Sequence, residues 1–283
     1  MRISVIIPTF RDNANLAQCL QALSVQTLAP SLFEVLVVNN APEEPLTVAS
    51  GPATVRVLEE RRPGSYAARN HAIRQARGDV LVFTDSDCVP DEHWLQAGLE
   101  EIGRSDCARL AGEVQIFTAD PPSATECYER IFAFDQASNA RSGVSVTANL
   151  FVRREIFERV GLFNENLFSG GDTEWNRRAQ EAGFSISYCA DAIVRHPARR
   201  SWSELKQKIM RTTGGKLGID PGYSLSLARS LSPPLGAFRK IAAAEEASFR
   251  TRLFALLIAY RIKLFRYVYL QRLKSGKMPL ERQ

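Results

Sequence analysis

The sequence predicts an α/β fold with a mainly parallel central sheet flanked by helices. Short apolar runs rich in β-branched residues occur at intervals along the first hundred residues, and the first two end at Pro8 and Asn39. Segments with apolar residues at helical spacing lie between them. Strands that alternate with helices pair in parallel through right-handed crossovers. We therefore expect an open α/β sheet over residues 1–105.

Four buried strands are expected in this part of the chain, because it contains four short apolar runs. They are residues 3–7, 35–38, 55–58 and 80–83. Helices are expected at 13–26, 65–77 and 91–102. The second helix stops at Gly78, and the third begins just after Pro90.

The next section, residues 106–198, mixes strands and helices, which indicates an elaboration of the same sheet. Extended segments are expected at 109–117, 144–152, 185–188 and 193–195, and helices at 123–137, 153–160 and 172–182. Gly214, Gly215, Gly218 and residues 221–222 predict a mobile loop, and 239–273 is expected to be helical. The expected domains are therefore residues 1–200, with halves at 1–105 and 106–200, and a helical C-terminal extension at 201–283.

Composition narrows the class of protein. The chain has 283 residues, of which 45% are apolar and 24% charged, as is typical of globular proteins. Five scattered cysteines without a CxxC pair argue against a disulfide framework and a structural zinc, and favour a reducing compartment. The apolar start is cut short at Pro8, and the longest later apolar stretch, 253–260, is far below the roughly 20 residues of a membrane span. We therefore expect a cytoplasmic protein.

Charge is unevenly distributed along the chain. The net charge is +5, but 16 basic and 5 acidic residues follow residue 200, a net of +11. The first 200 residues carry 20 basic and 26 acidic residues, a net of −6. An acidic body is a poor platform for nucleic acid, so we expect no nucleic-acid partner and a different partner for the basic extension.

Polar residues follow the expected strands at the edge where a parallel sheet binds ligands. Asp85 and Asp87 come directly after the fourth strand, and Asn39 follows the second. Two carboxylates at this spacing suit one hard cation, Mg²⁺ or Mn²⁺. The alternative is that the Asp-Ser-Asp triplet is only a turn and helix-cap cluster.

Five segments, in order along residues 1–200, carry a resemblance to a known family. The segment 78–87 (GDVLVFTDSD) resembles the aspartate-x-aspartate segment of family 2 glycosyltransferases, which have the GT-A fold. The other similar segments are 5–12, 64–70, 148–154 with 160–165, and 170–175. Several motifs in the right order are far more specific than one.

The resemblance implies a GT-A fold with a nucleotide-binding half and an acceptor half, a Mn²⁺ or Mg²⁺ cofactor, and a UDP or GDP type of sugar donor. It implies that Asp87 holds the metal, that Asp85 contacts ribose or metal-bound water, and that His196 is a third ligand unless it is a solvated loop histidine. The residues implied in the nucleotide pocket are Pro8, Thr9, Phe10, Asp12, Asn39 and Ser86.

The resemblance also implies which residues take part in the transfer of the sugar. Asp172 is the implied general base of an inverting transfer, where one carboxylate takes the proton of an acceptor hydroxyl, although an aspartate at a helix start can also be an N-cap. Arg69 would meet the diphosphate or support the acidic cluster, with an exposed helical arginine as the alternative. Asn149 would hydrogen-bond the transferred sugar or cap the end of a strand.

Two positions depart from the family pattern. Asn39 stands where an aspartate is usual, which weakens the preference for UDP. Gly171 stands where a glutamate is usual, and Glu174 is a candidate to replace that carboxylate. The pair Gly170 and Gly171 would let the backbone approach the sugar.

The basic extension mixes aromatic and basic residues without one clean amphipathic face. Such a segment can attach to the cytoplasmic face of a membrane, where a lipid-linked acceptor would be presented. The alternative is a helix pair packed on the acidic body or on a second subunit.

The sequence thus predicts an inverting, metal-dependent glycosyltransferase that acts on a glycan or lipid-linked acceptor in cell-surface glycan or glycolipid assembly. A processive synthase would carry membrane helices and a Gln-x-x-Arg-Trp motif, and neither occurs in this sequence. A sugar nucleotidyltransferase would carry a glycine-rich loop in place of residues 8–11. A non-catalytic, glycosyltransferase-like binding protein is the third alternative.

Overall fold

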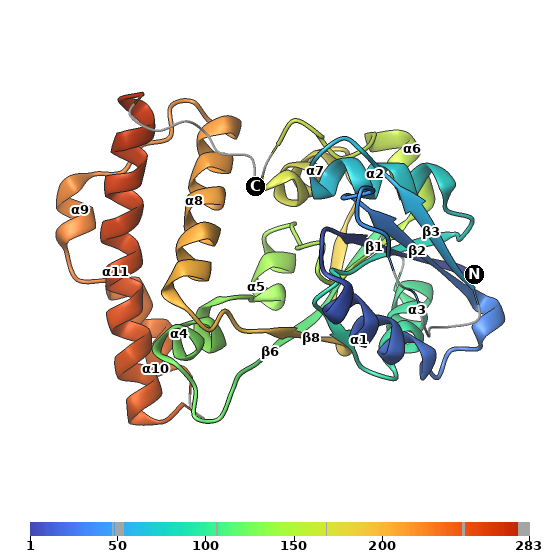
Figure 1. The fold of residues 1–283 in the computed structure, drawn as a ribbon, viewed down its shortest axis with the longest axis horizontal. Helices are drawn as coiled ribbons and strands as arrows, with labels where there is room; N and C mark the ends of the chain where they lie inside the picture. Colours follow the sequence, from blue (N-terminus) through green and yellow to red (C-terminus); the bar gives the residue numbers. More distant parts are fainter. Residues whose placement is uncertain (47, 49–53, 106, 168, 245–246, 277–283) are drawn as a thin grey trace. The chain divides into compact units, whose positions relative to one another are not determined.

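The computed structural model describes residues 1–46, 48, 54–105, 107–167, 169–244 and 247–276. These residues form two compact units (Figure 1). The sheet unit comprises Met1–Gln115, Asp135–Asn166 and Gly171–His196. The helical unit comprises Ile116–Phe134, Leu167–Gly170 and Pro197–Gln283.

One eight-stranded sheet, in the order β3-β2-β1-β4-β7-β6-β8-β5, runs through the fold. Its strands are β1 (Ile3–Thr9), β2 (Phe33–Asn39), β3 (Val55–Glu59), β4 (Val80–Phe83), β5 (Val89–Pro90), β6 (Arg109–Phe117), β7 (Leu150–Arg153) and β8 (Ile186–Pro197). The first four are parallel, as expected. However, β3 is a partly exposed edge strand and not the buried strand expected at 55–58. The pairs β4–β7, β6–β7 and β5–β8 are antiparallel, so the whole sheet is mixed.

The strand β1 lies between β2 and β4, and all its residues are buried. A strand covered on both faces needs a continuous apolar run instead of an alternating one, which is the pattern of residues 3–7. The register places Ile6 beside Leu36 and Phe83, and Thr9 beside Asn39. The parallel strands therefore end together at one edge.

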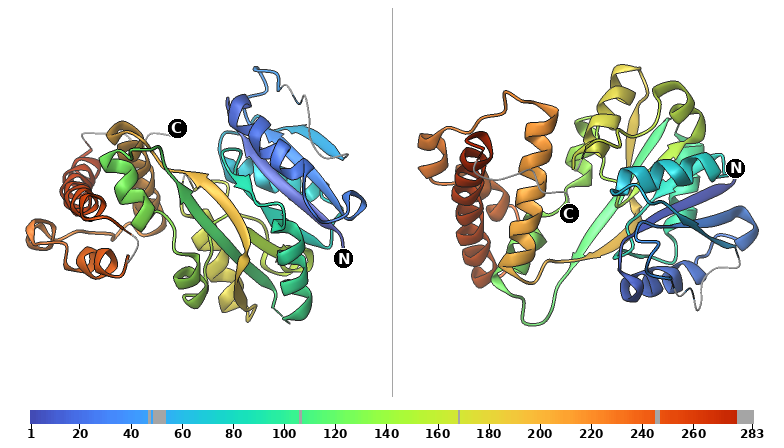
Figure 2. Two further views of the ribbon diagram at one scale, coloured as in Figure 1. Left: turned by 90° about the horizontal axis from the view of Figure 1, so that it is seen from below. Right: turned by 45° about the horizontal axis from the view of Figure 1, so that its top comes forward.

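Helices cover both faces of the sheet. The helices α1 and α3 lie on one face, and α2, α6 and α7 lie on the other (Figures 1 and 2). Right-handed crossovers produce this split, because α1 and α2 connect strands that step across the sheet in opposite directions. The helices of the sheet unit are α1 (Asn13–Ser24), α2 (Ser65–Gln75), α3 (Trp94–Arg104), α5 (Gln136–Arg141), α6 (Arg154–Val160) and α7 (Gly171–Glu181), with a 3₁₀ turn η1 at Pro30–Leu32.

An aromatic cluster holds α2, α6 and α7 against the sheet. Phe157 stacks on Trp175 with ring centroids 4.4 Å apart, and Phe163 contacts Phe83, Phe157 and Tyr66. Burial of these rings contributes about 1.5–3 kcal/mol each. The cluster thereby anchors the two helices, α2 and α7, that carry the candidate site.

Three expectations for residues 123–195 differ from the structure. The helix expected at 123–137 is two helices, because the Asp135 side chain caps α5 by accepting from the Ser138 N–H. The two short strands expected at 185–188 and 193–195 are one strand, β8, in which Cys189 and Ala192 are buried. The extended segment expected at 144–152 is a strand only from Leu150 onward.

The helical unit contains α4 (Ala124–Phe132), α8 (Trp202–Ile219), α9 (Leu227–Leu231), α10 (Leu235–Ala242) and α11 (Phe249–Lys274). Gly214, Gly215 and Gly218 lie within α8, so the mobile loop predicted there is wrong. A Cβ at Gly215 would meet the Ser169 carbonyl oxygen at 2.5 Å, which explains a glycine in a helix. The helical region expected at 239–273 is two helices.

Apolar contacts join α8 and α11, which lie side by side (Figure 2). Leu205 and Ile209 of α8 pack with Ile258 and Ile262 of α11. The fully buried carboxylate of Glu129 in α4 pairs with Arg199 at 3.0 Å and Lys208 at 2.8 Å, and these two cations hold its pKa below the usual value. Among the described residues, none of the helices combines the length and apolarity that a bilayer crossing requires.

Candidate functional site

The loop after β1 contacts the loops after its two neighbours. Arg11, whose φ is +52°, pairs with Glu43 at 2.9 Å and Glu44 at 3.0 Å beyond β2. Asp12 accepts a hydrogen bond from the Ser86 hydroxyl at 3.1 Å, beyond β4. The predicted pocket residues Asp12 and Ser86 therefore lie together.

The remaining residues of the first loop differ in exposure. Pro8 and Thr9 are buried, whereas the Phe10 ring is 57% exposed. The Thr9 hydroxyl is buried and has no hydrogen-bond partner among the described residues. A buried polar group without a partner costs free energy unless a ligand or water satisfies it. Thr9 thus offers a hydrogen-bonding group at the edge where β1 ends.

A possible metal-binding group follows from the pairing of β5 with β8. Val89 lies opposite Arg195 in an antiparallel register, which brings residues 87 and 88 next to residue 196. Ligand atoms of Asp87, Cys88 and His196 lie within 4.8 Å of one another, and the Asp87 carboxylate is 3.5 Å from Nε2 of His196. His196 is buried. The structure therefore brings Asp87 and His196 together, as expected.

The chemistry of this group fits a divalent cation. A carboxylate oxygen and an imidazole nitrogen are both common ligands of divalent metals. Burial raises the pKa of the Cys88 thiol well above its usual value, and the negative charges of Asp85 and Asp87 raise it further. The protonated thiol is a weak ligand, so Asp87 and His196 are the two strong donors of the group.

Asp85 contacts a buried arginine of α2. The Arg69 guanidinium donates to the Asp85 carboxylate at 2.5 Å, and the Arg69 side chain is only 4% exposed. Arg69 is therefore not an exposed helical arginine. Arg69 was expected to contact the diphosphate or to support the acidic cluster, and its contact with Asp85 agrees with the second role.

Asp172 is the second residue of α7, so it lies inside the first helical turn and not at the N-cap. One of its carboxylate oxygens accepts from its neighbour Thr173 N–H at 2.8 Å and from the Tyr66 hydroxyl at 3.4 Å. Tyr66 belongs to α2, one turn before Arg69, and the Arg69 guanidinium carbon lies 5.7 Å from the centre of its ring. The first two turns of α2 therefore contact both Asp172, through Tyr66, and Asp85, through Arg69.

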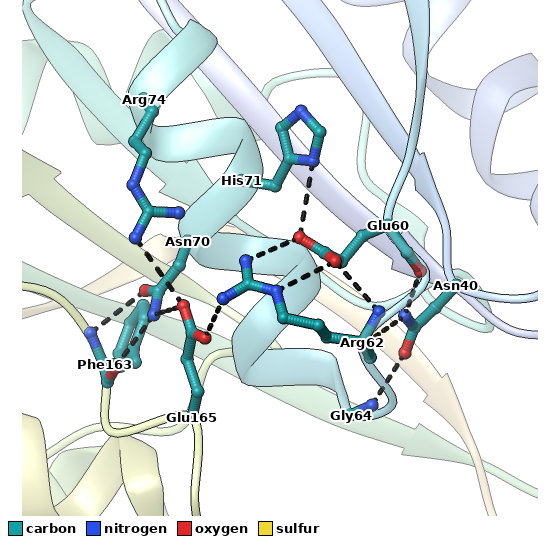
Figure 3. A network of polar contacts seen from close by, with 9 residues as sticks. All are labelled: Asn40, Glu60, Arg62, Gly64, Asn70, His71, Arg74, Phe163 and Glu165. Atoms are coloured by element: carbon teal, nitrogen blue, oxygen red, sulfur yellow. Dashed lines mark hydrogen bonds and ion pairs between the residues drawn. The ribbon is translucent and has the colours of Figure 1, made fainter.

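The loop that leads into α2 is held by a network of polar contacts (Figure 3). The Asn40 side chain donates to the carbonyls of Glu60 and Arg62 and accepts from the Gly64 N–H at 2.9 Å. Gly64 precedes α2 with φ +115°, a conformation that favours glycine. The chain therefore enters α2 in one defined direction.

The same network fixes α2 to the segment before α7. The Arg62 guanidinium pairs with Glu60 at 2.7 Å and Glu165 at 2.5 Å. The Asn70 amide donates to Glu165 and exchanges hydrogen bonds with the Phe163 backbone (Figure 3). These contacts hold α2, and with it Tyr66 and Arg69, in place.

Three expected roles do not agree with the geometry. Asn149 is fully buried, with its amide donating to the carbonyls of Glu113 and Ala192 and accepting from Trp94, so its amide group serves the fold and not a sugar. The Asn39 amide closes its own turn by donating to the Glu44 carbonyl and accepting from the Ala41 N–H. Glu174 pairs with Arg178 at 2.6 Å and so does not replace a carboxylate at position 171.

Sequence reasoning missed Tyr66, Cys88 and the Glu60–Arg62 pair. Tyr66 lay within a segment that carried the resemblance, and Cys88 directly follows Asp87. The signal for each residue was its closeness in sequence to residues already singled out. The Glu60–Arg62 pair had no signal, because its partner Glu165 is 103 positions away from Arg62.

Comparison with known proteins identifies the family of the chain and its fold. A model of glycosyltransferase-like family 2 matches residues 1–215. The chain belongs to glycosyltransferase family 2. It is 36% identical over 234 residues to the glycosyltransferase AglE of Haloferax volcanii, covering 80% of this chain and 77% of AglE. It is 23% identical to the O-antigen chain rhamnosyltransferase RfbN of Salmonella typhimurium, covering 69% and 66% of the two chains.

Solved structures share the fold of this glycosyltransferase. The mannosyltransferase PcManGT from Pyrobaculum calidifontis, solved with GDP-Man and Mn²⁺, matches with a TM-score of 0.61 at 16% identity, covering 97% of this chain and 86% of that one. TarS residues 1–349 of S. aureus, solved with UDP, matches with a TM-score of 0.53 at 18% identity, covering 98% and 92%. The expected family and the GT-A fold are thus confirmed.

Proposed function

We propose that this glycosyltransferase moves a sugar from a nucleoside-diphosphate sugar to an acceptor hydroxyl by an inverting, metal-dependent displacement. The observation that carries the proposal is the start of α2, where Tyr66 contacts Asp172 and Arg69, one turn later, contacts Asp85. The predicted base and the acidic cluster are thereby linked through one rigid element. A rigid element is what a site needs to hold its groups in reacting geometry.

In this mechanism Asp172 takes the proton of the acceptor hydroxyl while that oxygen bonds to the anomeric carbon. The bond from carbon to the diphosphate breaks on the opposite face, and the diphosphate leaves with the electron pair. One displacement inverts the configuration. No leaving-group acid is needed for a diphosphate, unlike the two-carboxylate arrangement of glycoside hydrolases.

The nucleotide side is assigned to the loops after β1 and β4. Asp87 and His196 would hold a Mn²⁺ or Mg²⁺ ion, which stabilises the charge of the leaving diphosphate when bound. Asp85, which is oriented by Arg69, would contact the ribose. Thr9 and Asp12 complete the pocket, and relatives of the same fold bind GDP-Man or UDP, which supports both donor types as candidates.

The acceptor is proposed to be a glycan or a lipid-linked saccharide in surface glycan assembly. This rests on relatives named for O-antigen and similar products. The helical unit supports attachment to an anionic membrane surface. Exposed large apolar side chains gather on its helices α9 to α11, namely Leu227, Leu231, Leu235, Phe238, Phe249, Leu253, Leu257 and Val268.

A pocket of about 310 Å³ lies among α4, α9, α10 and α11. Aromatic and apolar groups from Tyr128, Phe132 and Ile262 line it. Arg229, Lys263 and Arg266 line it as well. A pocket lined by both apolar and basic groups suits an amphiphile with an anionic head, as a phospholipid surface provides.

The function is tested with Asp172→Asn in the full-length chain. We expect sugar transfer from UDP- and GDP-sugars to fall about 100-fold to 10,000-fold, because the asparagine accepts no proton. Titration calorimetry with UDP or GDP and Mn²⁺ should show unchanged affinity. The exposed Asp191 supplies a matched control, Asp191→Asn, which should retain full activity.

Two outcomes contradict the proposal. Full transfer by Asp172→Asn removes this residue as the base. Nucleotide binding by the wild-type chain without turnover of any donor, in the presence of an acceptor extract, favours the non-catalytic binding protein.

A further inference from the structure

The Tyr66 hydroxyl lies between two groups at the start of α7, the backbone N–H of Gly171 and the carboxylate of Asp172. Its oxygen accepts a hydrogen bond from the Gly171 backbone N–H at 2.9 Å, and it lies 3.4 Å from a carboxylate oxygen of Asp172. A phenol has one hydrogen to donate and lone pairs to accept with. Since the Gly171 N–H occupies the accepting side, the hydroxyl hydrogen is available for the carboxylate.

The ring of Tyr66 fills the space beside Gly171. A Cβ at position 171 would lie 2.7 Å from ring carbon Cε2 and 2.8 Å from Cζ, closer than Cβ atoms approach in proteins. Gly171 is buried, so the ring and the backbone are in direct contact. The position where a family glutamate was expected therefore holds no side chain, because a tyrosine from α2 occupies that volume.

The environment keeps the Tyr66 hydroxyl protonated. Burial raises the pKa of Tyr66 to about 12, and the negative charge of Asp172 acts in the same direction. The Arg69 guanidinium lies over the ring of Tyr66, and its positive charge is paired with the Asp85 carboxylate. Tyr66 therefore stays a hydrogen-bond donor over the pH range in which an enzyme works.

We propose that Tyr66 is a positioning residue for Asp172, whose hydroxyl holds the base carboxylate at the start of α7 in place of the missing carboxylate at position 171. The proposal rests on the proposed role of Asp172. The hydrogen bond orients the carboxylate toward the acceptor side and stabilises its ionised form. The packing against Gly171 fixes the distance between α2 and α7, which sets where the carboxylate lies.

Tyr66→Phe tests this role, because phenylalanine keeps the ring against Gly171 and under Arg69 and removes only the hydroxyl. We expect kcat to fall about 10-fold to 100-fold, the loss associated with a hydrogen bond to a charged group. The donor KM and the affinity for UDP or GDP with Mn²⁺ should stay within about twofold of wild type. The acid limb of the rate profile should move to higher pH, because the carboxylate loses a donor that favours its charged form.

Tyr188→Phe is the matched control. Its hydroxyl donates to the Glu113 carboxylate at 2.6 Å within the same unit, so the change also removes one phenol–carboxylate hydrogen bond. We expect kcat and the acid limb to stay at their wild-type values. An equal loss in both variants would make the effect a general loss of packing and overturn the proposal.

If Tyr66→Phe folds poorly, a second variant tests the same hydrogen bond. Site-specific 3,5-difluorotyrosine at position 66 preserves the shape of the side chain and lowers the pKa of its phenol, which strengthens the donated hydrogen bond. The acid limb should then move to lower pH, in the direction opposite to Tyr66→Phe. An unmoved limb would overturn the proposal.

The variants also separate this proposal from the proposed function. Loss of transfer in Asp172→Asn together with wild-type kcat and pH profile in Tyr66→Phe overturns the positioning role alone. Full transfer in Asp172→Asn overturns the base assignment and the positioning role with it. Loss in both, with nucleotide binding retained, is the expected result.

Discussion

Asn39 shows how a single residue adapts the loop after β2. Its amide donates to the Glu44 carbonyl and accepts from the Ala41 N–H, both at 2.9 Å, and its side chain is buried. Only an amide offers a donor and an acceptor at these two places. The departure from an aspartate is therefore explained by the turn that the side chain closes.

Asn39→Asp should destabilise the protein although aspartate is usual at this place in the family. The carboxylate keeps the contact with Ala41 but has no hydrogen to donate, so it faces the Glu44 carbonyl oxygen unpaired. We expect a loss of about 1–3 kcal/mol in the free energy of unfolding, measured by urea titration at pH 7.

Asn164→Asp is the control for this change. Asn164 only accepts, from the Asn166 N–H at 3.0 Å, and an aspartate retains that contact. We expect no more than about 0.5 kcal/mol of change there. Equal stability of Asn39→Asp and wild type would show that the turn does not depend on the donated bond.

At the scale of elements, the approach to α2 depends on Glu60. Its carboxylate accepts from the Arg62 backbone and guanidinium and lies 3.5 Å from His71 (Figure 3). The hydrogen bonds from Arg62 lower the pKa of Glu60 from 4.5 to about 2, against the opposing effect of burial. A carboxyl group whose pKa is lowered by folding stabilises the folded state above the unfolded pKa, and this contribution is lost as the pH falls toward 2.

Glu60→Gln should therefore flatten part of the acid dependence of stability. At pH 7 the variant should unfold more easily than wild type by about 1 kcal/mol, a modest figure because the Arg62 side chain is 54% exposed and screened by solvent. The difference should shrink as the pH falls from the unfolded pKa toward 2, because the stabilisation by the charged carboxyl group is lost over that range. Thermal unfolding followed at pH 7, 4 and 2.5 measures the difference.

The exposed Glu181 supplies the control variant Glu181→Gln. It should track wild type at every pH. A Glu60→Gln difference that stays constant with pH would assign the loss to changed packing and not to the charge.

Local patterns predicted elements well where the pattern and the packing agree. The four parallel strands and α6 follow from apolar runs and their boundary residues. The single long strand β8 and the helical Gly214 and Gly215 did not follow, because both depend on partners distant in sequence. Gly215 is needed for the close approach of Ser169, and Tyr66 reaches Gly171 across 105 positions. Chemical motifs predicted the residues of the candidate site, whereas the contacts that orient these residues appear only in three dimensions.

At the scale of the whole molecule, positive charge and exposed apolar side chains are concentrated in the helical unit. The chain after residue 200 has a net charge of +11, and the exposed leucines and phenylalanines of α9 to α11 lie in the helical unit. Apolar side chains that insert at a lipid interface gain about 25 cal/mol per Å² of buried area, and each basic residue near an anionic surface adds about 1 kcal/mol. We therefore predict that the full-length protein binds vesicles that contain anionic phospholipid.

Leu235→Glu with Phe238→Glu should weaken that binding at least about tenfold, since both side chains are exposed on α10, at 71% and 49%. The matched pair is Val25→Glu with Leu32→Glu, which replaces exposed apolar groups of the sheet unit and should bind as wild type does. Cosedimentation with vesicles of phosphatidylglycerol and phosphatidylcholine measures the affinity. Binding should fall in pure phosphatidylcholine and at high salt, because the basic residues act through screened charge. Undiminished binding of the α10 variant, or an equal loss in the control pair, would contradict a membrane role for these helices and leave a protein partner as the occupant of the exposed surface.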